Sequence, residues 1–161
     1  MIRALTVRQP WAWAIIHGGK DVENRSRNIA RGHRGPVAIH AGISMDVGGV
    51  TDDRILAAIE AYYQKHGRGE AGGLVPTGAI IGVVDLVDVH HAHDCWRSMT
   101  HQGTGEVEEG HCSPWAEPDV YHLMFANPRP LAVPIPWRGM LGLWPVPADL
   151  EAMIDSQEVK R

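Results

Sequence analysis

The apolar run from Gly78 to His90, GAIIGVVDLVDVH, constrains the fold more than any other segment of this chain. Its middle is apolar at successive positions and rich in β-branched residues, so the pattern predicts a strand covered on both faces. A strand of this kind lies inside a sheet rather than at its edge. We therefore expect this segment to be the central strand.

Shorter patterned segments predict the other elements. We expect strands over 1–7, 20–27, 37–40, 121–125, 131–137 and 141–146. Helices are expected over 10–17, 51–66 and 147–155, each opened by a proline or by acidic residues. The prolines at positions 128, 130, 134, 136, 145 and 147 should confine the last strands to edges or barrel corners.

The order of these elements predicts an α+β fold. Helices do not alternate regularly with strands, which argues against a doubly wound parallel sheet. A small closed or partly closed β-barrel of about five or six strands, with two or three flanking helices, fits better. The 161 residues suit one domain over 1–161, with a long loop insertion at 92–118 and a tail at 156–161.

Targeting signals and cysteine usage indicate the compartment. No stretch approaches the roughly 20 apolar residues of a membrane span, and the N-terminus, with Arg3 and Arg8, does not resemble a signal peptide. Cys95 and Cys112 share one polar segment and suggest no disulfide framework. We expect a cytoplasmic protein without a membrane partner, and the oligomeric state stays open.

Charge is unevenly distributed along the chain. The net charge of −4 argues against a protein that coats long duplexes through phosphate contacts. Residues 1–45 hold seven Lys/Arg against two Asp/Glu, whereas the remainder holds eight against seventeen. This asymmetry predicts a local anion-attracting face on an acidic body, with random scatter of surface charge as the alternative.

A short motif within the basic part, G-x-K-x-x-E-x-R, comprises Gly18, Lys20, Glu23 and Arg25. On a strand, Glu23 and Arg25 share one side and Lys20 lies on the other, unless a bulge or turn near Asp21 brings Lys20 round. Together the three side chains would offer donors for phosphate and an acceptor for a base edge or ribose. A surface ladder of salt bridges is the alternative.

Neighbouring residues could complete a cleft for a base and a phosphate. Gln9 precedes a helix start, where backbone N–H groups attract anions. Trp11 or Trp13 could stack on a base. Trp11 lies on the apolar helix face, which also suits core packing, so Trp13 is expected to be the freer of the two. Arg34 belongs to the acid-free stretch 24–35 and suits phosphate or a stacked base.

Three more residues are candidates from other parts of the chain. His40 ends a short strand and is either a ligand residue or a buried core histidine. Asp85 shares a strand face with apolar residues, so its charge needs a partner, either a ligand donor or a structural cation. Trp115 follows the long loop and could fold over the cleft as a lid, or simply pack.

Histidines and cysteines cluster in the sequence after the central strand. They are His90, His91, His93, Cys95, His101, His111 and Cys112. Zinc takes ligands of these types, but the spacing fits none of the usual zinc fingers. We therefore predict no native metal site and no cofactor.

Several segments resemble the ASCH domain, a family of PUA-like barrels. These are LTVRQPWAWAIIHGGKDVENR followed by RGPVAIHAG, then GAIIGVVDLVDV, and finally SPWAEPDVYHLMFANPRPLAVPIPWRGMLGLW. The last is similar to the carboxyl half of bacterial members and of a human lipopolysaccharide-responsive relative. The resemblance covers about two thirds of the chain and includes the family's glycine, lysine, glutamate and arginine motif.

This resemblance implies an RNA- or nucleotide-binding cleft at the barrel mouth, lined by Lys20 and Glu23. One family branch hydrolyses the acetyl amide of a modified cytidine with the motif lysine and a threonine, and another has been associated with ribonuclease activity. Here Glu23 stands at the threonine position, which removes that nucleophile. If the chain is an enzyme, Glu23 would act as a general base through water, and Lys20 would stabilise negative charge.

These observations leave three functional hypotheses. The first is a module that binds single-stranded RNA, a nucleotide or a modified nucleoside. The second is a small hydrolase of N4-acylcytidine or RNA, with Lys20 and Glu23 in its active site. The third is a protein-interaction domain with a vestigial cleft. Net acidity and the lack of an extended basic stripe favour a small ligand over long RNA.

Overall fold

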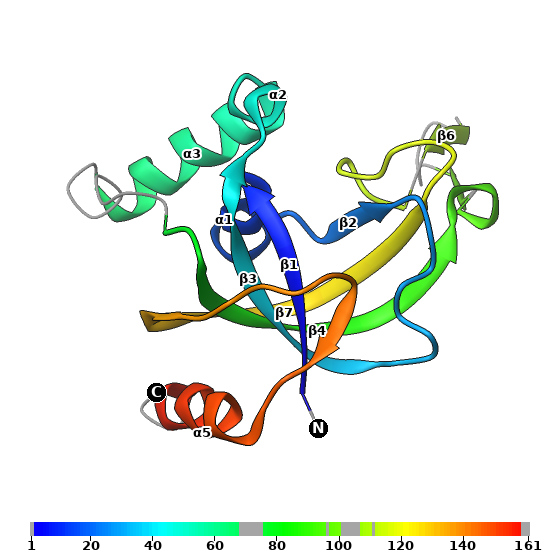
Figure 1. Cartoon of the computed structure of the whole chain (residues 1–161). Helices are drawn as coiled ribbons and strands as arrows, with labels where there is room; N and C mark the ends of the chain where they lie inside the picture. The colour runs from blue at the N-terminus through cyan, green and yellow to red at the C-terminus, as the bar shows by residue number, and fades with distance from the viewer. Residues whose placement is uncertain (1, 68–75, 96, 101–106, 111, 159–161) are drawn as a thin grey trace.

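The fold is seen in a computed structural model (Figure 1), which describes residues 2–67, 76–95, 97–100, 107–110 and 112–158. Its elements are β1 (Arg3–Gln9), α1 (Trp11–His17), β2 (Val22–Arg25), β3 (Gly35–Met45), α2 (Val47–Val50), α3 (Asp53–His66), β4 (Ala79–His91), the 3-10 helix η1 (Ala92–Asp94), β5 (Arg97–Thr100), β6 (Val107–Gly110), β7 (Tyr121–Pro136), β8 (Leu143–Pro145) and α5 (Ala148–Glu158). No helix in these ranges is both long enough and apolar enough to cross a membrane.

The main sheet has six strands in the order β2-β7-β4-β3-β1-β8. β1 and β3 run parallel, and the other neighbours are antiparallel. β4 has a strand on each side, as the apolar run Gly78–His90 predicts. The strands curve strongly (Figure 1), but the described ones do not close into a barrel, because β2 and β8 end the order. The α+β class is therefore confirmed, whereas the described residues form an open, curved six-stranded sheet rather than a closed barrel and contain four α-helices rather than two or three.

Both faces of the sheet are buried, and successive residues of β4 show how. Ile80 packs with the apolar residues of α5, whereas Ile81 packs with those of α1. Their exposed fractions are only 0% and 4%. Because neighbouring strand residues point to opposite faces, a strand between two helical layers must be apolar at successive positions.

Several boundaries differ from the predictions. β3 is eleven residues long, and β7 joins two predicted strands into one. The pair β5–β6 lies within the predicted loop 92–118, and α5 continues past the predicted start of the tail. Asn127, with φ 50°, lies at a register shift between β7 and β4, so the gap between the two predicted strands is a bulge within one strand.

The prolines of β7 lie where the sheet can accept them. β2 pairs only with the first residues of β7, Tyr121–Met124, so the proline-rich second half has β4 as its neighbour on one side. On the other side, the side chain of Gln157 in α5 accepts from the N–H of Val133 and donates to its C=O, both at 2.9 Å. The prediction that prolines mark an edge is thus confirmed for this half of β7.

Candidate functional site

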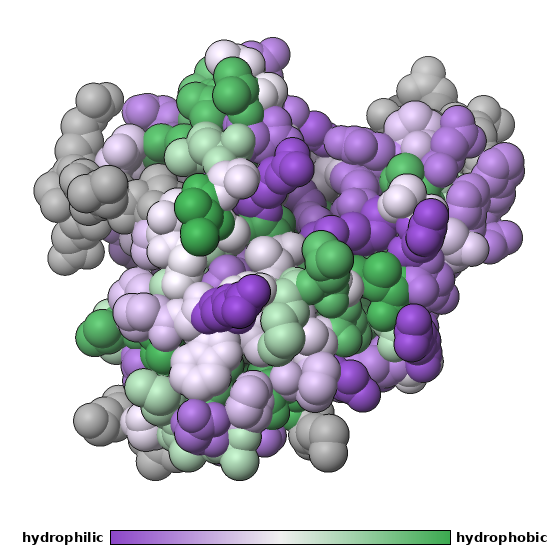
Figure 2. Space-filling view, in the orientation of Figure 1, coloured by the Kyte–Doolittle hydropathy of each residue, from purple (hydrophilic) through white to green (hydrophobic). Residues whose placement is uncertain are grey.

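A cavity of about 510 Å³ opens among the ends of β1, α1, β2 and α3. Figure 2 shows the corresponding face, with hydrophilic residues gathered in a hollow between α2 and the part of the molecule that carries β6. The residues lining the cavity are Thr6, Val7, Arg8, Trp11, Lys20, Glu23, Asn24, Arg25, Asp46, Arg54, Trp115, Glu117, Met140, Leu141 and Gly142. We call this cavity the pocket.

The floor of the pocket is an ion-paired triad. Lys20 Nζ lies 3.1 Å from Glu23 Oε2, and Arg25 Nη2 lies 3.0 Å from Glu23 Oε1. The triad forms because α1 ends in a turn at Gly19, whose φ of +72° suits glycine. The N–H of Lys20 then donates to the C=O of Ala14 at 2.9 Å. This turn brings Lys20 to the side of β2 that carries Glu23 and Arg25.

The triad is largely buried. The exposed fractions of the Lys20, Glu23 and Arg25 side chains are 4%, 11% and 30%. Lys20 Nζ also donates to the C=O of Val22, and Arg25 Nη2 donates to the C=O of Thr6 at 2.9 Å. Two cations around one carboxylate leave one net positive charge. Among the described residues, the buried Arg25 Nε has no hydrogen-bond partner, so the floor retains a donor.

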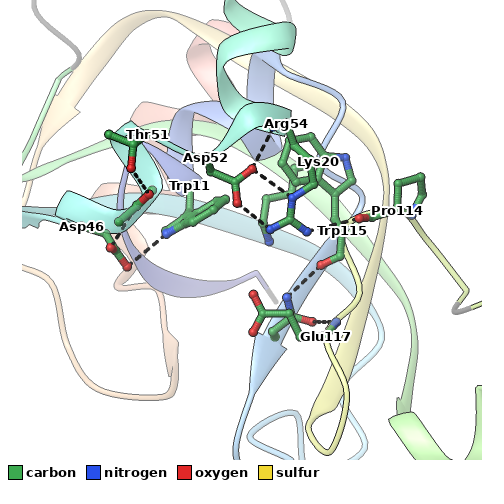
Figure 3. A network of polar contacts seen from close by, with 12 residues as sticks. Trp11, Lys20, Asp46, Thr51, Asp52, Arg54, Pro114, Trp115 and Glu117 are labelled. Carbon is green, nitrogen blue, oxygen red and sulfur yellow. Dashed lines mark hydrogen bonds and ion pairs between the residues drawn. The ribbon is translucent and has the colours of Figure 1, made fainter.

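Two tryptophans and an arginine form a wall of the pocket (Figure 3). Arg54 Cζ lies 5.3 Å from the ring centroid of Trp115 and 6.0 Å from that of Trp11. Asp52 holds the guanidinium through contacts of 2.7 Å and 3.0 Å, and the C=O of Pro114 accepts a further bond of 3.2 Å. The hydrogen bonds that Arg54 donates to Asp52 lower the pKa of Asp52 and raise the pKa of Arg54. This cation is therefore fixed in position.

The orientation of Trp11 depends on Asp46. The indole Nε1–H of Trp11 donates to Asp46 Oδ2 at 3.2 Å, and the N–H of Gly49 donates to Asp46 Oδ1 at 3.2 Å. The indole bond is the main cause of the lowered pKa of Asp46. Asp46 is the N-cap of α2, so it joins the helix start to the pocket wall.

The segment 113–117 is fastened to β2. Asn24 Nδ2 donates to the C=O of Trp115 at 2.9 Å, and the N–H of Glu117 donates to Asn24 Oδ1 at 3.2 Å. Trp115 is 8% exposed and packs with Val22 and Ile55. It is therefore a packed wall of the pocket rather than a free lid.

Gln9 and Trp13 were predicted at the site but do not line the pocket. Gln9 is fully buried, where its Nε2 donates to the C=O of Pro76 and its Oε1 accepts from the N–H of Trp13. The helix start therefore does not offer that N–H to an anion. Trp13 packs edge-on against Tyr62 of α3, with ring centroids 5.6 Å apart. The relative roles of the two tryptophans are the reverse of our expectation, because Trp11 faces the pocket.

Three further candidates lie elsewhere. His40 is 2% exposed, bonds to the C=O of Trp137 at 2.9 Å and lines a neighbouring cavity of about 880 Å³. Asp85 forms an ion pair of 2.9 Å with Arg129, which satisfies its charge structurally. Arg34 lies 3.6 Å from an acidic side chain on the surface and is 42% exposed. The fold thus gathers Trp11, Lys20, Glu23, Arg25 and Trp115, but not the other five predicted residues.

Sequence reasoning missed much of the pocket wall. Arg54 had a usable signal, because the stretch Asp52-Asp53-Arg54 at a helix start places a cation beside an N-cap carboxylate. No sequence signal pointed to Asp46 or Glu117, since their positions in the pocket depend on long-range packing. Nor did any signal point to Leu141, which lines the pocket and is 98% exposed.

Comparison with known proteins places the fold. The sequence model of the ASCH domain matches residues 5–130. Among solved structures, the crystal structure of ASCH from Zymomonas mobilis is similar, with a TM-score of 0.53 and 14% sequence identity over 96% of this chain and 94% of that chain. At this identity, the likeness concerns the fold alone. No curated protein matches this chain.

Proposed function

The chain belongs to the ASCH domain family, and from that premise we propose that its pocket binds one nucleotide or modified nucleoside, free or as part of single-stranded RNA. The observation that carries this proposal is the pairing of a buried cationic floor with an aromatic wall. Lys20, Glu23 and Arg25 form the floor, and Trp11 and Trp115 stand beside it. This combination suits a ligand that is flat at one end and anionic at the other.

Each part of such a ligand has a matching group. A base would stack against an indole, a contact worth about 1–3 kcal/mol. A phosphate would accept from Arg25, whose planar guanidinium presents several donors and whose side chain is 30% exposed. Glu23 keeps lone pairs for a ribose hydroxyl or an exocyclic amine, since each of its oxygens accepts more than one bond.

The charge of the lining supports a small ligand over a long one. The cations are Arg8, Lys20, Arg25 and Arg54, and the acids are Glu23, Asp46 and Glu117, which leaves one net positive charge. Long RNA needs many phosphate contacts, whereas one excess charge suits one phosphate. We therefore expect the affinity for a mononucleotide to depend only weakly on salt, with a log–log slope of about −0.7 or shallower.

Arg25→Gln should weaken mononucleotide binding about tenfold or more. A hydrogen bond to a charged group contributes about 1.5–3 kcal/mol, and the variant loses both the charge and the fork of donors. Calorimetric titration with the four nucleoside monophosphates and with a short single-stranded RNA would measure the change. Arg34→Gln is the matched control, because it makes the same substitution at an ion pair outside the pocket.

The comparison of the two variants decides the proposal. Arg34→Gln should bind mononucleotides as the wild type does. Equal weakening by both variants would mean that the loss of any positive charge weakens binding, wherever it lies. Unchanged binding in Arg25→Gln would mean that the ligand does not bind at Arg25. A wild type that binds neither nucleotides nor nucleosides would contradict the proposal as a whole.

A hydrolase is the alternative use of the same residues, because Lys20 and Glu23 lie together in the pocket. What disfavours it is that Glu23 stands where the amidohydrolase branch of the family has its threonine, so that nucleophile is missing. Glu23 would have to act as a general base through water instead. We expect no turnover of N4-acetylcytidine or of short RNA at high enzyme concentration. Turnover that disappears in Glu23→Gln would reverse this conclusion.

A further inference from the structure

Four side chains of metal-binding type meet near the ends of β4 and β7, outside the pocket. His90 and His122 lie directly opposite one another on the two strands. Cys95 follows η1, and Cys112 follows β6. One ligand atom from each residue lies within 4.8 Å of all the others. His101 and His111, which share this stretch of sequence, lie outside the described residues.

The spacing of these atoms approaches that of a tetrahedral site. Zn–S bonds of about 2.3 Å and Zn–N bonds of about 2.0–2.1 Å imply separations of about 3.3–3.8 Å between ligand atoms. Cys112 Sγ and His122 Nδ1 are 3.4 Å apart, and the widest pair in the cluster is within 4.8 Å. Closing around an ion therefore requires the widest pair to come together by about 1.0–1.5 Å.

The hydrogen bonds around the histidines leave one nitrogen of each directed at the cluster. His90 Nδ1 lies 2.7 Å from Asp88 Oδ2, so this nitrogen is the donor, and in the neutral ring Nε2 carries the lone pair. His90 Nε2 is buried and has no partner among the described residues. His122 Nε2 lies 2.7 Å from the C=O of Glu117, which assigns the proton there and the lone pair to Nδ1. Zinc-binding histidines are commonly oriented by such carboxylate and carbonyl acceptors.

The cysteines have matching surroundings. The N–H of Cys112 donates to Cys95 Sγ at 2.8 Å, and an N–H donor stabilises negative charge on sulfur. Cys95 is 3% exposed. No disulfide joins it to Cys112. Two free cysteines, Cys95 buried and Cys112 partly buried, lie beside two oriented histidines and have no role in the pocket.

We propose that His90, Cys95, Cys112 and His122 bind one zinc ion in a closed tetrahedral site. Binding forms two Zn–S and two Zn–N bonds, and the two thiol protons are released to solvent. Four protein ligands leave no position for substrate, so the ion is structural. The site does not rest on the proposed function of the pocket. It departs from our sequence prediction of no metal site, which considered the spacing within the loop and not the strand pairing that brings the two histidines together.

The ion would brace the pocket wall. Cys95 and Cys112 bracket the β5–β6 pair, so the metal would close that loop at its base. Ser113, the next residue, bonds to Asp21 and accepts from the N–H of Trp115 at 3.0 Å. Zinc at Cys112 would therefore hold the start of the segment that carries Trp115.

Metal analysis of the full-length protein tests the proposal. We expect one zinc per chain by mass spectrometry. Cobalt substitution should give the strong visible bands of tetrahedral Co²⁺ and a thiolate-to-cobalt charge-transfer band. His90→Ala should lose the stoichiometric zinc, and His93→Ala, three residues away with a side chain 74% exposed, should keep it. Zinc should raise the melting temperature of the wild type and of His93→Ala only.

A milder variant is needed if substitutions of the four metal-binding residues prevent folding. Asp88→Asn leaves all four ligands in place but weakens the acceptor of His90, so zinc affinity measured against a chelator should fall about 10–100-fold. Zinc content below one ion per ten chains after loading would overturn the proposal. So would stoichiometric zinc in the Cys95→Ser/Cys112→Ser double variant, or a Cys95–Cys112 disulfide in intact-mass analysis of the loaded protein.

Discussion

Replacing Glu23 with alanine is expected to lower the free energy of unfolding by about 3–5 kcal/mol, the range for breaking a buried ion pair. Glu23 is the only carboxylate bonded to both Lys20 and Arg25 among the described residues. Without it, two cations face each other in a site where the Lys20 side chain is 4% exposed. Urea unfolding of wild type and variant at pH 7, followed by circular dichroism, measures the difference.

The control removes all three charges together. The triple variant Lys20→Met/Glu23→Leu/Arg25→Met should be more stable than Glu23→Ala, because apolar replacement of a buried ion network costs little or even stabilises. It should nevertheless bind no nucleotide. A loss below about 1 kcal/mol in Glu23→Ala, or a triple variant less stable than the single one, would show that the triad behaves as a surface feature.

Trp115→Ala should have the second largest effect and act on stability and binding at once. Truncating a buried tryptophan costs about 3–5 kcal/mol, and Trp115 is 8% exposed against Val22 and Ile55. Arg54 also loses the nearer of its two aromatic neighbours. Loss of the wall should weaken mononucleotide binding about tenfold, as expected for one stacking contact of roughly 1.4 kcal/mol.

Trp13→Ala separates these two effects. Trp13 packs against Tyr62 and does not line the pocket, so its loss should lower stability while nucleotide affinity stays near that of the wild type. Unfolding curves and calorimetric titrations on both variants, at a temperature where each is folded, give the comparison. If Trp13→Ala weakens binding as much as Trp115→Ala, the wall has no specific role.

The central strand could be predicted because consecutive apolar residues indicate that both faces of a strand are buried. The extent of β7 could not, because Asn127 and Pro128 carry the local signal of a turn. In the folded chain these residues form a bulge, because β4 pairs with β7 on both sides of them. Local chemistry thus favours an irregular residue at this point but does not reveal the strand that spans it.

The site was predicted where its geometry is local. Lys20, Glu23 and Arg25 lie within six residues, so the sequence placed them near one another. Strand alternation nevertheless put Lys20 on the other side and left open whether a turn brings it round. The orientation of Trp11 depends instead on Asp46, which is thirty-five residues away. A helical wheel shows which face is apolar but not which neighbour meets it. The same limit hid the pairing of His90 with His122, which is a matter of strand register.

The outer margin of β7 has a consequence for how molecules of this protein behave at high concentration. An open strand edge recruits strands from other molecules through its free N–H groups. Four residues of this strand half lack a backbone N–H because they are prolines: Pro128, Pro130, Pro134 and Pro136. The N–H and C=O of Val133 are bonded to the side chain of Gln157. The sheet can therefore stay open on this side without becoming a template for intermolecular aggregation.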